Sequence, residues 1–137
     1  MNAKDGVQPA IFVSESEADA LYEIASNCAE PLREAAAKLM AEIDRANIIQ
    51  TGIAADVVTM NSQVEFTDER SGVTRSVHLV WPQDADMDSS RLSVLTLVGA
   101  GLIGMRAGSS IAWPDQSGQV RQLRISNVTQ PRSATEH

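Results

Sequence analysis

The sequence predicts an α+β protein in which a short antiparallel helical hairpin precedes a small antiparallel β domain with one short helix. Two observations predict it. Apolar residues recur at helical spacing before residue 50 and alternate at strand spacing after it. Glycine, serine, threonine and valine become frequent at the same point. The length of 137 residues fits one ordinary domain or two very small units, and it excludes a large multidomain enzyme.

The first helix is predicted to begin near Ser14. Ser14 and Glu17 fit a capping box, in which each side chain satisfies a free backbone N–H at the start of a helix. The apolar residues that follow lie on one helical face, and they are Ala18, Leu21, Ile24, Ala25 and Cys28. This face is predicted to be buried.

The second helix is predicted to contain Pro31 in its first turn, where a missing N–H costs nothing. Its apolar positions are spaced as in a coiled-coil seam, and they are Leu32, Ala36, Leu39, Ile43 and Ala46. A short connection, Asn27–Glu30, favours an antiparallel hairpin with arms of ~21 Å. Two ordinary helices packed on a core are the alternative.

Short strands are expected after Thr51 and Gly52. Gln63–Thr67 and Ser76–Val80 alternate apolar and polar residues around the turn Asp68–Gly72. The remaining predicted elements are strands at 92–97, 110–113 and 119–128 and a short helical turn over 98–105. The expected organisation is therefore a tail (1–10), a helical hairpin (11–50), a β domain (53–129) and a second tail (130–137).

The charge of the chain argues against nucleic acid as its partner. The formal net charge is −7, and residues 1–50 hold −5 of it, with nine acidic and four basic residues. A sequence-independent nucleic-acid binder needs a basic surface, and aromatic residues for base stacking make up only 4%. We therefore expect no direct sequence-specific DNA binding. The expected binding partner is a protein surface.

The composition also predicts the compartment. Cys28 is the single cysteine, so neither an intramolecular disulfide nor a thiolate zinc site is expected. No apolar run approaches the ~18–20 residues of a membrane span, and the first ten residues lack the apolar core of a secretory signal. We expect a cytoplasmic protein, without membrane contact, that is a monomer.

Two motifs suggest ligands but lack the residues that the chemistry needs. Gly99, Gly101 and Gly104 match the dinucleotide pattern, but the stretch about 20 residues on is basic where an acid should hold the ribose. We expect these glycines to let a short helix pack closely on the sheet. The run from Asp84 to Asp88 opens like a calcium loop, yet the required glycine and bidentate carboxylate are absent.

Catalytic groups are equally sparse. His78 is expected on the outer face of its strand, His137 lies in a tail, and Cys28 falls on an apolar helix face. No Ser/His/Asp or Cys/His set can be assembled from these residues. The sequence therefore predicts no catalytic residues, no metal and no cofactor, and the protein is not expected to be an enzyme.

Five segments of the β part follow one another in a recognisable order: VVTMNS (57–62), VHLV (77–80), DAD (84–86), LSVL (92–95) and GAGLIG (99–104). This order resembles the C-terminal domain of the Gre transcript-cleavage factors. The family of regulators of nucleoside diphosphate kinase (Rnk), which joins a short helical hairpin to such a domain, is a closer match. The resemblance is strong over about 57–128 and mostly topological over 12–49.

The resemblance implies an FKBP-like sheet around a short helix, and binding to RNA polymerase near the rim of its secondary channel. The segment matching the Gre docking turn consists of Thr96, Leu97, Val98 and Gly99. Gre factors usually have Asn or Asp and then Ser-Pro in a stretch where this chain has Leu95, Thr96 and Leu97. The turn therefore lacks an acid and the stiffness of proline.

The hairpin tip, which includes Asn27, Cys28 and Glu30, departs further from the Gre pattern. Gre factors carry two acids at the tip that help to hold a catalytic Mg²⁺, which requires oxygen ligands. Here Glu30 is the one acid, on a shorter hairpin. Transcript-cleavage stimulation is therefore not predicted. FKBP-type prolyl isomerisation is not predicted either, because the domain has few aromatics to line such a pocket.

Two functions follow from the resemblance. The first is a polymerase-binding transcription regulator, similar to an elongation factor, that competes with Gre factors at the secondary channel without cleavage. The second is a non-catalytic protein-binding module that regulates nucleotide metabolism through nucleoside diphosphate kinase. An isomerase or a nucleotide-dependent enzyme has the least support.

Overall fold

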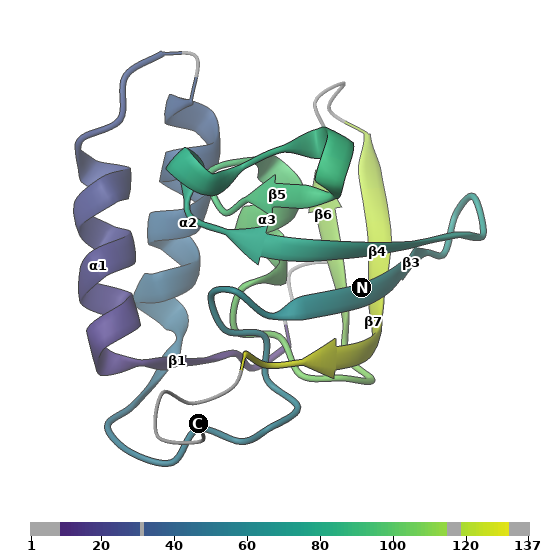
Figure 1. Ribbon diagram of the computed structural model, residues 1–137, viewed down its shortest axis with the longest axis horizontal. Helices are drawn as coiled ribbons and strands as arrows, with labels where there is room; N and C mark the ends of the chain where they lie inside the picture. Colours follow the sequence, from purple (N-terminus) through teal and green to yellow (C-terminus); the bar gives the residue numbers. More distant parts are fainter. Residues whose placement is uncertain (1–8, 31, 115–118, 132–137) are drawn as a thin grey trace, which may run out of the picture.

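Within the part of the chain that the structure describes, the protein is an α+β fold with three α-helices, a mixed five-stranded sheet (Figure 1) and a separate pair of short strands. The computed structural model describes residues 9–30, 32–114 and 119–131. In chain order the elements are β1 (Phe12–Ser14), α1 (Glu15–Ser26), α2 (Arg33–Arg45), β2 (Asn47–Ile49), β3 (Gln63–Asp68), β4 (Val73–Val80), the 3₁₀ turns η2 (Pro82–Asp84) and η3 (Met87–Ser89), β5 (Arg91–Ser93), α3 (Leu97–Leu102), β6 (Ser110–Pro114) and β7 (Val120–Thr129).

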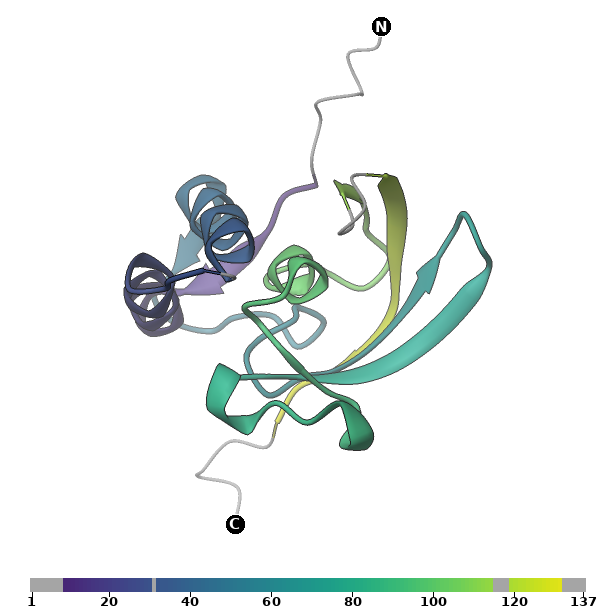
Figure 2. The same cartoon turned by 90° about the horizontal axis from the view of Figure 1, so that it is seen from above.

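The elements form three layers. The short helix α3 lies between the α1–α2 hairpin and the curved five-stranded sheet (Figure 2). Buried residues from all three layers belong to one hydrophobic cluster, for example Leu21, Leu39, Leu102 and Ile125, each fully buried. The hairpin therefore does not stand apart from the sheet, because both bury their apolar faces around α3.

Helix α1 follows the sequence prediction closely. Ser14 caps it, with Oγ accepting a hydrogen bond from Glu17 N at 3.3 Å. On the predicted face, Ala18, Leu21 and Ala25 are buried and the other two residues are half-buried. The Glu17 carboxylate bonds elsewhere: it accepts from Met60 N at 3.3 Å and 3.4 Å through its two oxygens. Glu17 therefore links α1 to the loop before β3.

Helix α2 differs from the prediction at its start. Pro31 lies outside the described residues, and the helix begins at Arg33. Ala36, Leu39 and Ile43 are buried as the seam predicts, but Leu32 is 41% exposed. The interpretation of Leu32 as a buried seam position was wrong, because it precedes the helix that packs against both α1 and α3.

The prediction of an entirely antiparallel sheet was also wrong. The strand order is β5-β4-β3-β7-β6, and β5 runs parallel to β4, while the other neighbours are antiparallel. The reason is the connection after Val80, which passes through η2 and η3 before β5 begins at Arg91. This crossover brings the chain back by three residues, so that Arg91–Ser93 run beside His78–Val80, the last residues of β4, in the same direction.

The predicted strand over 92–97 is shorter in the structure, because polar side chains end it. Strand β5 stops at Ser93, whose Oγ accepts from Leu95 N at 3.0 Å. Thr96 then caps α3, which occupies 97–102 instead of the predicted 98–105. Serine and threonine hydroxyls that bond to nearby backbone compete with sheet pairing in this way.

Strands β1 and β2 were not predicted. They form a parallel pair in which Phe12, Val13 and Ser14 lie opposite the three residues Asn47–Ile49. Three residues are too few to show a strand period, and the pairing joins segments more than thirty residues apart. Only the fold brings them together.

The half-buried carboxyl of Glu17 predicts a pH-dependent contribution to stability. Burial raises the pKa of its carboxyl above the ordinary value of 4.5, although the hydrogen bond from Met60 N opposes the shift. The folded state thus binds a proton more tightly than the unfolded state, and this stabilisation is lost as the pH rises through the folded-state pKa. In urea unfolding, we therefore compare the free energy of unfolding of Glu17→Gln with that of the parent chain. We expect the difference to shift in favour of Glu17→Gln as the pH rises from 4 to 7.

The Gln variant keeps an acceptor for Met60 N, so the matched variant is Glu17→Ala, which removes it. We expect Glu17→Ala to be less stable than Glu17→Gln at both pH values. A difference between Glu17→Gln and the parent chain that does not change with pH would contradict this account of the carboxyl.

Candidate functional site

Thr96–Gly99, the segment predicted to dock on a partner and called the docking turn below, is held in a fixed shape by Thr96. Its hydroxyl donates to Ser93 O at 2.8 Å and accepts from Gly99 N at 3.0 Å. Leu97 and Gly99 are buried, whereas Thr96 and Val98 are half-buried. Of the four consecutive residues that the sequence predicts here, Thr96 and Val98 are therefore partly accessible to a partner.

Glycine is required at positions 99, 101 and 104 by close packing. A Cβ at Gly99 would lie 2.2 Å from Ser93 O, and one at Gly101 would lie 2.9 Å from two atoms of the Trp113 ring. Gly104 has a φ of +80°, a region that favours glycine, and a Cβ there would meet Ile11 Cβ at 3.0 Å. The expectation that these glycines let a short helix pack closely on the sheet is confirmed for Gly99, beside β5, and for Gly101, beside β6. Gly104 follows α3 and packs against Ile11 and Phe12 instead.

Trp113 and Lys38 complete the surroundings of the turn, and sequence reasoning assigned neither to it. Trp113 on β6 is buried, and its indole Nε1 donates a hydrogen bond to Leu97 O. The ammonium of Lys38 on α2 lies over the indole, 5.8 Å from its ring centroid, at a distance typical of a cation–π contact. A buried tryptophan usually finds a hydrogen-bond partner for its N–H. This general preference was the one feature of the sequence that could have suggested a contact of Trp113.

The hairpin tip lies at the far end of α1 and α2 (Figure 1). Asn27 ends α1, and its amide donates to Glu23 O at 2.9 Å. Glu30 is exposed and lies 4.0 Å from Arg33, an exposed ion pair of small energetic value. Cys28 is half-buried and lines a hollow of about 320 Å³ between the helices. The described part of the tip thus presents one carboxylate, beside a hollow lined by apolar side chains together with Ser26 and Arg33.

The other polar groups considered from the sequence have structural partners. His78 is exposed on the outer face of β4, as predicted, and its Nε2 lies 3.0 Å from Asn61 O. Asp86 accepts hydrogen bonds from Asp88 N at 3.1 Å and Ser89 Oγ at 3.2 Å within its own loop. Among the described residues, no group of three or more His, Cys, Asp or Glu side chains is arranged to hold a metal ion.

Across the ranges that the structure describes, none of the helices combines the length and apolar character required to cross a bilayer.

Comparison with known proteins identifies the family. The family described as "Transcription elongation factor, GreA/GreB, C-term" matches residues 53–130. The chain is 34% identical over 135 residues to the "Regulator of nucleoside diphosphate kinase" of Escherichia coli (strain K12), covering 95% of this chain and 97% of that protein. The Shigella flexneri protein of the same name gives the same values.

A solved structure gives an independent comparison. It is the "Prokaryotic transcription elongation factor GreA/GreB from Nitrosomonas europaea", with 36% sequence identity and a TM-score of 0.67. The match covers 89% of this chain and 99% of that one. The chain therefore belongs to the GreA/GreB family and, within it, to the regulators of nucleoside diphosphate kinase.

Proposed function

We propose that the chain is a transcription regulator that binds RNA polymerase at the rim of the secondary channel and does not stimulate transcript cleavage. The observation that carries the proposal is the docking turn. Residues 96–99 fall within the range 53–130 that matches the GreA/GreB C-terminal family. Thr96 and Trp113 brace the turn by hydrogen bonds, and Val98 is half-buried. A preorganised turn loses little conformational freedom when a partner binds.

The absence of cleavage stimulation is inferred from the tip. A carboxylate that helps to hold Mg²⁺ must be joined by further oxygen ligands. In the described part of the tip, Glu30 is the one acidic side chain, and Arg33 lies beside it. We infer a non-enzymatic monomer of the cytoplasm, with no cofactor and no sequence-specific DNA binding. The proposal also includes an FKBP-like sheet and a coiled-coil seam in the hairpin.

Binding to core RNA polymerase tests the proposal directly. The immobilised protein is expected to retain the polymerase, a Gre factor is expected to displace it, and added protein should not increase cleavage of a stalled transcript. No retention at micromolar concentrations would contradict the proposal.

A substitution in the docking turn gives a sharper test. We expect Val98→Asp to weaken polymerase binding at least tenfold, because a carboxylate at an apolar contact must be desolvated when the complex forms. The control is Val120→Asp, the same change at a position that is 60% exposed at the start of β7, where binding should be unchanged. A melting curve of each variant separates lost binding from lost folding. If the two folded variants bound the polymerase with equal affinity, the turn would not be part of the interface.

The second candidate function rests on the name of the curated relatives, which describes them as regulators of nucleoside diphosphate kinase. A direct effect would require this chain to bind the kinase itself. A pull-down that enriches the kinase without polymerase subunits would favour this function over the first.

A further inference from the structure

The N-terminal strap, which we define as residues 9–14, touches both the helical hairpin and the sheet layer. Ile11 and Val13 are almost completely buried in the shared hydrophobic cluster. The strap's strand β1 pairs with β2 at the end of α2, and Phe12 N donates to Gly104 O at 3.0 Å. The strap therefore lies between two parts of the molecule that are far apart in the chain.

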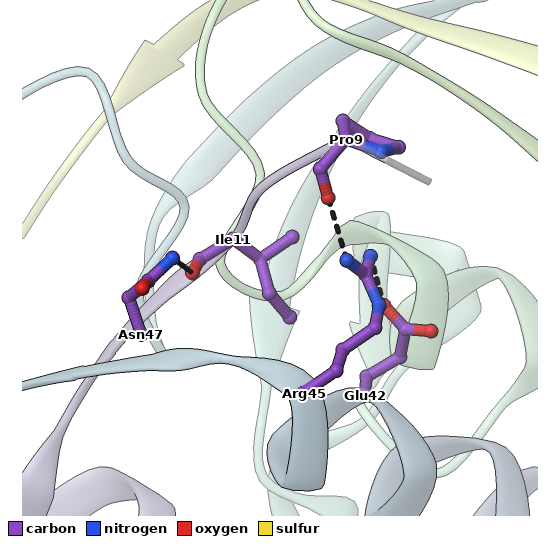
Figure 3. A network of polar contacts seen from close by, with 5 residues as sticks. All are labelled: Pro9, Ile11, Glu42, Arg45 and Asn47. Carbon is purple, nitrogen blue, oxygen red and sulfur yellow. Dashed lines mark hydrogen bonds and ion pairs between the residues drawn. The ribbon is translucent and has the colours of Figure 1, made fainter. Parts of the chain in front are cut away.

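On the hairpin side, the anchor of the strap is Arg45 (Figure 3). Its Nη1 donates to Pro9 O at 2.6 Å, while Nε and Nη2 donate to Glu42 Oε1 at 3.1 Å and 2.7 Å. Glu42 is buried, so its carboxylate holds the guanidinium in place. Asn47 adds two hydrogen bonds to Ile11 O, from its backbone N at 2.9 Å and from Nδ2 at 3.3 Å.

On the sheet side, the strap is seated on the loop after α3. Gly104 has no Cβ and so leaves room for Ile11, as described above. Arg106 lies with its guanidinium carbon 5.9 Å from the centroid of the Phe12 ring, and Asp56 pairs with Arg106 at 3.1 Å. Hydrogen bonds, packing and charge thus hold the strap to the hairpin on one side and to the sheet layer on the other.

The covalent link between the hairpin and the sheet offers less restraint. After β2 the chain runs through residues 50–56, which are exposed or half-buried and include Gly52 at a φ of +75°. The loop joins the sheet layer from Ala54 onwards: Gln130 Nε2 donates to Ala54 O at 2.7 Å, and Ala107 N donates to Asp56 O at 2.9 Å. Three other contacts join the hairpin to the sheet layer: the packing of α2 on α3, the hydrogen bonds from Met60 N to Glu17, and the Lys38–Trp113 contact. The strap adds a fourth, at the end of the hairpin opposite the tip.

We propose that the strap fixes the hairpin in one orientation relative to the docking turn, and that Arg45 is its positioning residue. The consequence for binding rests on the proposed function: tip and turn reach the polymerase together only when the hairpin keeps this angle. If loss of the Arg45 guanidinium lowered the population of the binding-competent hairpin orientation to about one tenth, the apparent affinity for polymerase would fall about tenfold.

A distance measurement tests the orientation without the polymerase. Spin labels are placed on Ala29→Cys at the tip and Gln122→Cys on β7, in a Cys28→Ser background. The test variant is Glu42→Gln with Arg45→Met, which removes the guanidinium without leaving a buried charge unpaired. The control is Glu42→Gln alone, which keeps Arg45 for Pro9 O.

We expect a single narrow distance in the parent and the control, and a broad distribution in the double variant with its helix content retained. Arg45→Lys in the Glu42→Gln background should restore part of the narrow population, because an ammonium can also donate to Pro9 O. An unchanged narrow distribution in the double variant would overturn the proposal, since packing on α3 would then suffice.

Polymerase affinity is then measured for the same proteins. A loss of about tenfold in the double variant, with the control unchanged, supports the effect on binding. A broad distribution with unchanged affinity would overturn that effect while leaving the strap's structural role in place. If the parent does not bind polymerase at all, the proposed function fails, and the distance measurement still decides the role of the strap.

Discussion

Gly99→Ala is expected to destabilise the protein by about 3 kcal/mol or to prevent its folding, at the upper end of the range for overpacking. The added methyl carbon would lie 2.2 Å from Ser93 O, 2.9 Å from Thr96 Oγ1 and 3.0 Å from Ser93 C. Two of these are backbone atoms, which cannot rotate away as a long side chain would. The same atoms shape the docking turn, because Ser93 O also accepts the Thr96 hydroxyl.

Urea unfolding followed by circular dichroism measures the loss, with Gly108→Ala as the control. Gly108 has a φ of +90°, but a Cβ added there would have no neighbouring atom within 4 Å, so alanine at this position tests backbone strain without a clash. Such strain costs roughly 1–2 kcal/mol. A smaller loss for Gly99→Ala than for Gly108→Ala would show that α3 can shift away from β5, and the turn would not be rigid.

The sequence predicted those parts of the fold that local patterns determine. The apolar face of α1, the cap at Ser14 and the alternation in β3 depend on neighbours within a few residues, and the structure confirms each. Gly99 and Gly101 were correctly interpreted as glycines that allow close packing, because the sequence lacked the acid that a dinucleotide site needs.

The features that sequence analysis missed depend on distant partners. Arg45 reaches Pro9 across 36 residues, and Trp113 reaches Leu97 across 16. The parallel pairing of β5 with β4 depends on the path of the crossover and not on any period within β5. At the candidate site, the four residues of the turn were predicted by resemblance, but the contacts of Lys38 and Trp113 that surround it follow only from packing of α2 and β6 on α3.

Trp113→Ala is expected to cost about 3–5 kcal/mol, the range for removing a buried tryptophan from a core. The indole fills the space beside Gly101, and its N–H donates to Leu97 O in the docking turn. Alanine leaves a cavity under α3 and removes that donor. Urea unfolding checks the loss of stability, and a variant as stable as the parent chain would show that α3 and β6 collapse onto each other without the ring.

Trp113→Phe separates the ring from its hydrogen bond. Phenylalanine keeps much of the apolar area but cannot donate to Leu97 O, and a single hydrogen bond contributes about 1 kcal/mol. The folded Phe variant should therefore lose polymerase affinity out of proportion to its small loss of stability, if the bond holds the turn in its binding shape.

Lys38→Met gives the comparison on the other side of the ring. A cation–π contact at a partly exposed site contributes roughly 0.5–1 kcal/mol, so this variant should fold almost as well as the parent. An affinity loss in Lys38→Met would then indicate a contact between the ammonium and the partner, whereas a loss confined to Trp113→Phe would indicate that the shape of the turn alone controls docking.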